Sequence, residues 1–211
     1  IRWQRGLYFA LYIGWSFFIG FFISRIYVFY GGIKMRNSKT KTMILNAILL
    51  GIGFIAHQIF PAIAGGITPD LTLVMLFCIM IINRNDYKSC LVAGIISGIF
   101  SALATKFPSG QVPNMVDKLV TVNVMFILMK AMYALPLLNK LKEKKDQVII
   151  FVMTLVGTFV SGLVFLVTAA AMVGLPASLM SLLVAVVLPS IVLNVVASMV
   201  LFNIIKLALK R

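Results

Sequence analysis

The stretch FPSGQVPNMVDKLVT, residues 107–121, places polar and ionisable side chains directly beside membrane-spanning sequence. Pro113 suits the first turn of a helix, because its missing N–H would be unpaired there in any case. An acid next to a base at the mouth of a membrane helix is a functional-site hypothesis by default. The polar residues recur at i, i+3, i+4 and i+7, so they share one helical face: Asn114, Asp117, Lys118 and Thr121.

The composition assigns the chain to the membrane proteins. Hydrophobic residues make up 62% of the 211 residues and charged residues only 11%, whereas a soluble domain carries about 25% charged residues. Several apolar runs reach the roughly 20 residues that a helix needs to cross a bilayer. These runs are apolar on all sides, unlike the alternating pattern of a membrane β-barrel. We therefore expect an all-α, polytopic membrane protein.

The remaining chemistry-bearing residues exclude several classes of function. The net charge is +14, but the basic residues lie between apolar runs, and no nucleic-acid recognition motif is present. Cys78, Cys90 and the single histidine, His57, have neither pairing nor metal-ligand spacing. The sequence contains no Ser/His/Asp set, phosphate-binding loop or paired carboxylates. We expect no enzyme activity, no metal and no cofactor, and we expect both thiols to be buried.

The first 34 residues stand apart from the rest of the chain. Residues 7–30 form an aromatic-rich apolar run that Arg25 interrupts, and Gly31-Gly32 ends it. The segment from Met35 to Lys41 then reads like the start of a membrane protein, a methionine followed by a short basic leader. Residues 1–34 are either an extra N-terminal hydrophobic helix or sequence upstream of the working protein, and we favour the second interpretation. The chain is thus divided into residues 1–34 and a six-helix unit at 35–211.

From Met35 onward, apolar runs alternate with short polar or Pro/Gly-rich breaks. Pro61, Pro136 and the segment 174–176 each end an apolar run, because proline cannot continue a helix. Pro189 lies inside the last run, which is long for one span, so we expect a kink or an interfacial first turn there. The six predicted helices cover residues 42–60, 69–82, 87–105, 113–135, 148–173 and 177–209.

The basic residues predict the orientation in the membrane. With both ends of the six-helix unit in the cytoplasm, the cytoplasmic segments hold twelve Lys and Arg residues, and the external segments hold only Lys106 and Lys118. This asymmetry is the positive-inside pattern of multi-pass membrane proteins. The stretch 107–121 then lies on the outer side, as do residues 61–70 and 174–178.

The outer start of the helix at 113–135 is the predicted binding site. Asp117 could accept an ammonium group and Lys118 could bind a carboxylate, so together they suit a zwitterion such as an amino acid. The unpaired N–H groups of the helix N-terminus also favour an anion. The alternative is that Asp117 pairs within the helix while Lys118 extends to lipid headgroups. Neutral hydrogen-bonding candidates beside them are Asn114, Gln111 and Thr121.

Three further features belong to the neighbouring predicted helices. Asp70 follows Pro69 at the start of the helix at 69–82 and is expected to cap it. His57 either lines a pocket or bonds to a neighbouring helix. Ala47 and Gly51 are small residues four apart, which permit close approach of another helix in a bilayer.

Three segments carry a resemblance to a known family. They are FPSGQVPNMVDK at 107–118, TPDL at 68–71, and NAILLGIG at 46–53 followed by His57-Gln58. Together they resemble the bacterial tryptophan transporter family of Firmicutes, which is similar to the membrane substrate-binding (S) components of energy-coupling factor transporters. The resemblance covers residues 35–211 and departs from the common S-component pattern at Gly51, where alanine is usual.

The resemblance implies a six-helix, S-component-like bundle in the bacterial cell membrane that captures tryptophan or a related indole compound on its outer side. It also implies a transmembrane coupling subunit, docked on the face of Ala47 and Gly51, and two cytoplasmic ATPases. In the site, Asp117 would hold the ammonium and Lys118 the carboxylate. Two alternatives stay open: a stand-alone carrier coupled to protons or sodium through Asp117 or Asp70, and a structural subunit without a ligand. The residues expected against the indole are Phe54, Phe60 and Phe107.

Overall fold

The structure is a computed structural model that describes residues 38–60 and 68–210. Within these residues every regular element is helical, which confirms the all-α prediction. The extra helix expected at 1–34 lies outside the described residues. The elements are α2 (Ser38–Ile59), α3 (Leu71–Ile82), α4 (Tyr87–Ala104), α5 (Gln111–Ala134), α6 (Pro136–Asn139), the 3₁₀ turn η1 (Lys142–Lys144), α7 (Lys145–Met172), α8 (Leu179–Leu182), the π-helical η2 (Leu183–Val187) and α9 (Leu188–Lys210).

The helices have the length and composition of a polytopic membrane protein. Four helical segments are long and apolar enough to cross a membrane: Lys39–Ile59, Tyr87–Ala104, Lys145–Met172 and Leu179–Leu209. α3 is apolar but has only 12 residues. α5 has 24 residues and contains Asp117 and Lys118. The structure therefore contains all six predicted helices. Two of them, α3 and α5, depart from a simple apolar span; α5 carries the predicted site and α3 approaches it.

Aspartate side chains cap α3 and α4. Asp70 accepts a hydrogen bond from the Leu73 N–H at 3.0 Å, which confirms the predicted cap. Asp86 accepts from the Ser89 hydroxyl at 2.7 Å and from the Ser89 N–H at 3.1 Å. These hydrogen bonds favour the ionised carboxylate, so the Ser89 hydroxyl and N–H lower the pKa of Asp86. Both helix starts are thus fixed by local bonds, with a four-residue turn at 83–86 between the two helices.

α5 begins two residues before its predicted start. The Asn114 N–H donates to the Gly110 carbonyl at 3.0 Å, and Pro113 lies in the first turn as expected. A Cβ at Gly110 would collide with the Thr105 hydroxyl oxygen, so this tight approach requires glycine. The helix ends at Ala134 because Leu135 precedes a proline and adopts an extended conformation.

Pro189 disrupts the last long helix, as predicted. The segment passes from α8 through the π-helical η2 into α9. Pro189 has no N–H to donate to the carbonyl of residue 185, so one α-helical hydrogen bond cannot form at this point. The Ser190 hydroxyl donates to the Val186 carbonyl at 2.7 Å beside the missing bond. The irregular turn therefore follows from the proline.

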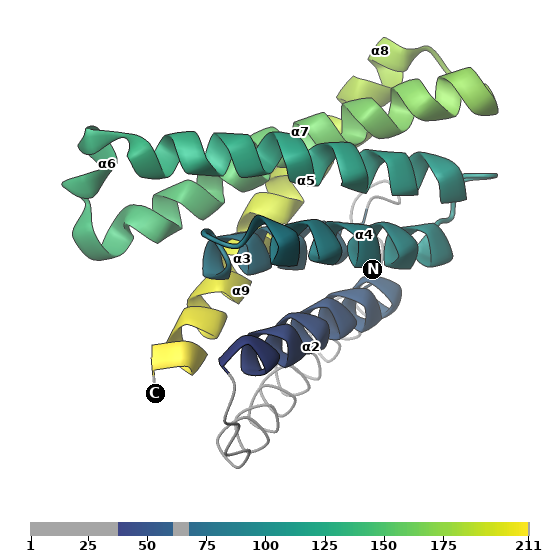
Figure 1. Cartoon of the computed structure of the whole chain (residues 1–211). Coiled ribbons are helices and arrows are strands. Elements are labelled where there is room, and N and C mark those ends of the chain that lie inside the picture. The colour runs from purple at the N-terminus through teal and green to yellow at the C-terminus, as the bar shows by residue number, and fades with distance from the viewer. Residues whose placement is uncertain (1–37, 61–67, 211) are drawn as a thin grey trace, which may run out of the picture.

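α3 forms the centre of the bundle. It contacts α2, α4, α5, α7 and α9, and all of its residues except Ile82 are buried. Figure 1 shows α4 and α5 side by side, with α2 on the other side of α4 and α7 beyond α5. The surrounding helices shield α3 from the lipid, which explains how so short a helix can lie in a membrane protein.

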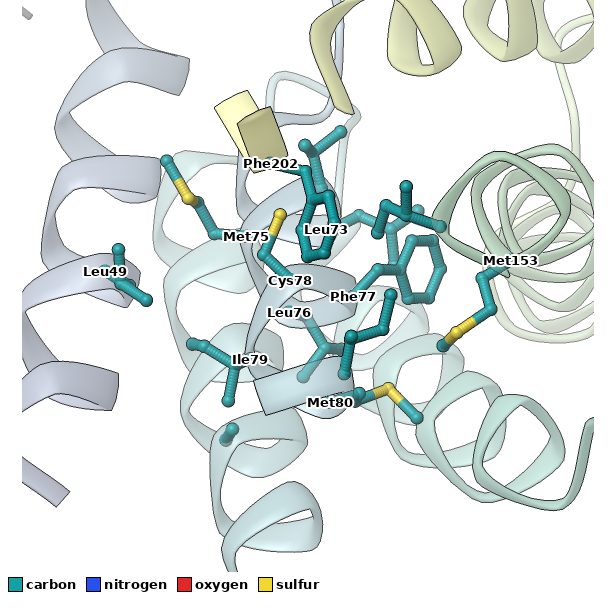
Figure 2. Packing of buried hydrophobic residues seen from close by; sticks show 14 of the residues in the cluster. Leu49, Leu73, Met75, Leu76, Phe77, Cys78, Ile79, Met80, Met153 and Phe202 are labelled. Carbon is teal, nitrogen blue, oxygen red and sulfur yellow. The ribbon is translucent and has the colours of Figure 1, made fainter. Parts of the chain in front are cut away.

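The core packs around α3 on all sides. Figure 2 shows Leu49 of α2 on one side of α3, Met153 of α7 on the opposite side, and Phe202 of α9 above it. Phe77 contacts α7 so closely that a Cβ at Gly157 would overlap its ring. Lipid tails are as apolar as these side chains, so close van der Waals packing is what stabilises the contact.

At the far end of the bundle, Asp146 joins four segments. The Tyr133 hydroxyl at the end of α5 donates to Asp146 Oδ1 at 2.7 Å. Arg84 and Lys206 lie 4.0 Å and 3.9 Å from the carboxylate oxygens of Asp146, and the Arg84 guanidinium lies 4.8 Å from the centre of the Tyr133 ring. These groups are partly exposed, so each ion pair contributes little stability on its own.

Candidate functional site

Lys118 lies at the centre of a buried polar network near the start of α5. Its residue is only 1% exposed. Its ammonium group donates to Asp117 Oδ2 at 2.7 Å, to Asp70 Oδ2 at 2.9 Å and to Ser161 Oγ at 3.2 Å. An ammonium has three N–H donors, and all three have partners here. Lys118 therefore joins α5 to the start of α3 and to the middle of α7.

Both oxygens of the Asp117 carboxylate also have donors. The Thr121 hydroxyl, one turn further along α5, donates to Oδ1 at 2.9 Å. The Ser161 hydroxyl on α7 donates to Oδ2 at 2.8 Å, beside the Lys118 ammonium. Burying a carboxylate is tolerable only when such bonds replace its hydration.

Asp70 extends the network to α9. Its carboxylate accepts from Lys118 and from the Leu73 N–H, while its own N–H donates to Asn194 Oδ1 at 2.8 Å. The Asn194 amide in turn donates to the Thr158 hydroxyl of α7 at 3.1 Å. The buried network, defined as Asp70, Asp117, Lys118, Thr121, Thr158, Ser161 and Asn194, therefore spans four helices.

The charges of the buried network do not balance. Two carboxylates, Asp70 and Asp117, share the single ammonium of Lys118. With all three groups ionised, the formal charge is −1. Asp117 is buried on every side, whereas the Asp70 side chain keeps 28% of its surface exposed. Unbalanced charge inside a membrane protein is costly and marks a functional site more often than a structural one.

The structure brings three of the predicted binding residues together. Asp117, Lys118 and Thr121 are all buried in the network, as their common helical face predicts. The alternative in which Lys118 extends to lipid headgroups is wrong, because acceptors from α3, α5 and α7 surround its ammonium. Asn114 is only half-buried, and its amide donates to the Gly110 carbonyl at 2.8 Å. Gln111 is exposed on the first turn of α5.

The predicted aromatic and histidine residues lie on separate elements. Phe54 of α2 stacks on Phe100 of α4 with ring centres 4.7 Å apart, and Phe107 meets Phe165 of α7 edge to face at 5.4 Å. Phe60 packs half-buried against the core. The remaining candidate, His57, has Nδ1 3.0 Å from the Pro69 carbonyl, which places its ring beside the Asp70 end of the network.

Reasoning from the sequence missed three members of the network and one pairing. Asp70 was predicted as a cap, and as a coupling residue in the alternative of an ion-driven carrier, but not as a partner of Lys118. Ser161, Thr158 and Asn194 are isolated polar residues in otherwise apolar helices. Such residues usually face the bundle interior in a membrane protein, and that signal could have identified them.

The predicted partner-docking residues face away from the bundle. Ala47 is exposed, and an added Cβ at Gly51 would meet no atom within 4 Å. Met43 and Ile55, one turn beyond each of them, are 63% and 40% exposed. The outer face of α2 is therefore an apolar strip with small side chains in the middle and larger side chains at both ends.

Comparison with known proteins gives one family. The family described as tryptophan transporter TrpP matches residues 39–210 of the chain. A relative from Clostridium perfringens, called probable tryptophan transport protein, is 42% identical over 179 residues, which covers 84% of this chain and 97% of that protein. Proteins of the same description from Bacillus subtilis and Clostridium acetobutylicum are 39% and 38% identical, over 82% and 81% of this chain and 95% and 94% of theirs. No solved structure matches the chain.

Proposed function

This chain belongs to the tryptophan transporter TrpP family, and from that premise we propose that it captures tryptophan from outside the cell as the substrate-binding component of an uptake system. The observation that carries the proposal is the buried pairing of Lys118 with Asp117 and Asp70. A free amino acid carries one ammonium and one carboxylate, which are the same two groups that the network already pairs.

Tryptophan enters a network whose donors are all occupied by replacing charged groups of the protein with its own groups of the same charge. The α-ammonium of tryptophan replaces Lys118 at the Asp117 carboxylate. The α-carboxylate of tryptophan replaces Asp117 at Lys118, which keeps Asp70 as a second partner. Every charge stays paired through this exchange, so the large cost of a lone buried charge is avoided. Thr121 keeps Asp117 in place from within α5.

The indole ring then lies against the neighbouring aromatic side chains. Phe107 and Phe165 already form an edge-to-face pair close to the start of α5, and Phe54 pairs with Phe100 across α2 and α4. Aromatic rings attract one another in offset-stacked or edge-to-face arrangements, and the indole ring would contact one of these phenylalanines in the same way. His57 lies in the last turn of α2 beside the Pro69 carbonyl, and Phe60 follows directly after the end of that helix.

A binding experiment tests the role of Asp117. Calorimetry on the purified chain should show stereoselective binding of L-tryptophan that Asp117→Asn abolishes. That variant keeps the Lys118–Asp70 pair, so we expect it to fold. The matched control is Asp86→Asn, which removes an exposed carboxylate at the opposite end of α4 and should bind normally. Unchanged tryptophan affinity in Asp117→Asn would exclude Asp117 from the site.

The exposed strip on α2 supports the proposal of a separate energising module. Ala47 and Gly51 allow another helix to approach α2 closely, and Met43 and Ile55 border the contact. We place a transmembrane coupling subunit on this strip, with cytoplasmic ATPases behind it. Gly51→Leu should leave tryptophan binding intact and prevent both copurification with that subunit and uptake into cells. Normal uptake in Gly51→Leu would exclude this docking face.

The charge imbalance of the buried network favours one alternative, a stand-alone carrier driven by an ion gradient. Vesicles that contain only this protein distinguish the two mechanisms. An ion gradient that drives labelled tryptophan into such vesicles would support the carrier. A structural subunit, in contrast, would show no thermal stabilisation by any amino acid.

The distribution of the basic residues supports one orientation in the membrane. We propose that the protein lies in the bacterial cell membrane with both ends of the six-helix unit in the cytoplasm. The start of α5, with the network behind it, then faces outside. A single cysteine placed at exposed Gln111 should react with an impermeant thiol reagent in intact cells, and one at Lys88 should not. The reverse labelling pattern would overturn this topology.

A further inference from the structure

Phe165 lies one turn beyond Ser161 on α7. Residues four apart in a helix lie on the same face, and the Ser161 side chain faces α5, where it bonds to Lys118 and Asp117. The Phe165 ring is directed to the same neighbour, because it meets the ring of Phe107, just before α5, with centres 5.4 Å apart and planes at 85°. One face of α7 therefore contacts the charged pair and, one turn further along, makes an aromatic contact.

The spacing of these two contacts fits one amino acid. Four residues of helix rise about 6 Å, so Phe165 lies roughly that far along α7 from Ser161 and the charged pair beside it. In an aromatic amino acid a single CH2 group joins the ring to the α-carbon, which places the ring at a similar distance from the ammonium and the carboxylate. A ligand held by Asp117 and Lys118 would thus bring its ring to Phe165.

Local bonds hold Phe107 in position before α5. Its N–H donates to the Thr105 hydroxyl oxygen at 3.3 Å, and its carbonyl accepts from the Gly110 N–H at 3.0 Å. A group that is fixed before the ligand arrives loses little conformational entropy on binding. Phe165 has the same advantage, because it lies within the regular helix α7.

The second aromatic pair, Phe54 and Phe100, lies on a different side of α4. Gly98 marks the side of α4 that faces α5, since a Cβ there would be 3.4 Å from Lys118 Cβ. Phe100 follows two residues later, about 200° around the helix, and its ring meets Phe54 of α2. Figure 1 shows α2 and α5 on opposite sides of α4. α4 therefore lies between this pair and the charged groups of α5.

We propose that Phe107 and Phe165 form the subsite for the indole ring, and that Phe165 determines the preference for an aromatic side chain. This inference rests on the proposed function and selects one of its two aromatic pairs. Rings attract one another in edge-to-face and offset-stacked arrangements, in addition to the effect of buried area. The subsite therefore favours aromatic amino acids over aliphatic ones of similar size. Residues 163–167 are all apolar, which favours an uncharged side chain.

Calorimetry with L-tryptophan on the purified full chain tests Phe165. Phe165→Leu keeps a large apolar side chain and removes the ring, so it should weaken binding about threefold to tenfold, the value of one aromatic pair. Phe165→Tyr keeps the ring and should bind within about twofold of wild type. The matched control is Phe159→Leu, which makes the same change at a phenylalanine of α7 that is 42% exposed. This control should bind tryptophan like wild type.

Two competing ligands distinguish a ring contact from a general loss of structure. L-phenylalanine and 3-cyclohexyl-L-alanine share a backbone and a similar size, but only the first is aromatic. In competition with labelled L-tryptophan, the wild-type protein should prefer L-phenylalanine, and Phe165→Leu should remove most of this preference. A variant that was merely less stable would lose affinity for both ligands and keep the preference.

Three results would overturn the subsite. The first is an unchanged tryptophan affinity in Phe165→Leu, and the second is an unchanged preference for L-phenylalanine in that variant. The third is a loss of tryptophan affinity in Phe54→Leu that equals or exceeds the loss in Phe165→Leu, which would place the ring against the other pair. The proposed function is tested separately by Asp117→Asn. Loss of binding in that variant, together with any of these three results, would refute the subsite and leave the proposed function in place.

Discussion

Replacing Lys118 with methionine should destabilise the protein strongly. Methionine keeps the length of the stem but removes the charge, so Asp117 and Asp70 remain without a counter-charge. The Lys118 and Asp117 side chains are each 2% exposed, and breaking a pair so deeply buried costs about 3–5 kcal/mol. Asp70 is 28% exposed and keeps its bond from the Leu73 N–H, so we assign most of this loss to Asp117.

The second substitution makes the prediction specific. In Lys118→Met the formal charge of the network changes from −1 to −2, and adding Asp117→Asn returns it to −1. Asparagine can accept from one of the Thr121 and Ser161 hydroxyls with its amide oxygen and donate to the other hydroxyl oxygen with its NH2 group. The double variant should therefore recover most of the lost stability. A purely steric role for Lys118 would predict that the second substitution adds to the damage.

Equilibrium unfolding of the purified protein in detergent measures both variants. The free energy of unfolding should fall by about 3–5 kcal/mol in Lys118→Met and should rise again in the double variant. A single variant within about 1 kcal/mol of wild type would refute the buried-pair reasoning, because that is the value of an exposed pair. A double variant no more stable than the single one would refute the charge argument.

Three further predictions concern packing, capping and the thiols. Gly157→Ala should cost about 1–3 kcal/mol of stability in a denaturant titration, because its methyl group would overlap the Phe77 ring. The control is Gly51→Ala, whose methyl group meets no atom within 4 Å and which should unfold like wild type. Asp86 has a lowered pKa in the folded state, so its contribution to stability is present above its unfolded pKa and is lost as the pH falls through its folded pKa. Asp86→Ala should therefore reduce the fall of the melting temperature at acid pH. An unchanged fall would contradict the assignment. Both cysteines are fully buried, so a thiol reagent should label them only on unfolding, and rapid labelling of the native protein would show that the core opens.

The helices could be predicted because the bilayer restricts the backbone. A spanning segment must pair its own N–H and C=O groups, so apolar runs between prolines and polar turns become helices. Pro189 and the Asp70 cap act through local bonds, which is why both predictions are confirmed. The early start of α5 was missed because it depends on the close approach of Gly110 to Thr105. That contact arises from a tight turn between the two residues, which the helical pattern does not reveal.

The site could be predicted only in part, because its bonds connect distant segments. Asp117 and Thr121 lie one turn apart on one helix, so helical periodicity brings them together. Lys118 and Asp70 are 48 residues apart, and their bond requires α3 to pack against α5. A lysine stem can reach either the headgroups or the interior, and the acceptors on Asp70 and Ser161 decide between them. No local pattern around Lys118 contains that information.

The shortness of α3 has a consequence for how the protein enters the membrane. Twelve residues at 1.5 Å each span about 18 Å, well short of the roughly 30 Å hydrocarbon layer. A helix that cannot reach both headgroup regions is poorly suited to integrate by itself. The turn at 83–86 joins it to α4, so we expect the two to insert as a hairpin. In an in vitro translocation assay, α3 alone should fail to integrate and the α3–α4 pair should succeed. The other helices that surround α3 would then stabilise it in a membrane that does not stabilise it alone.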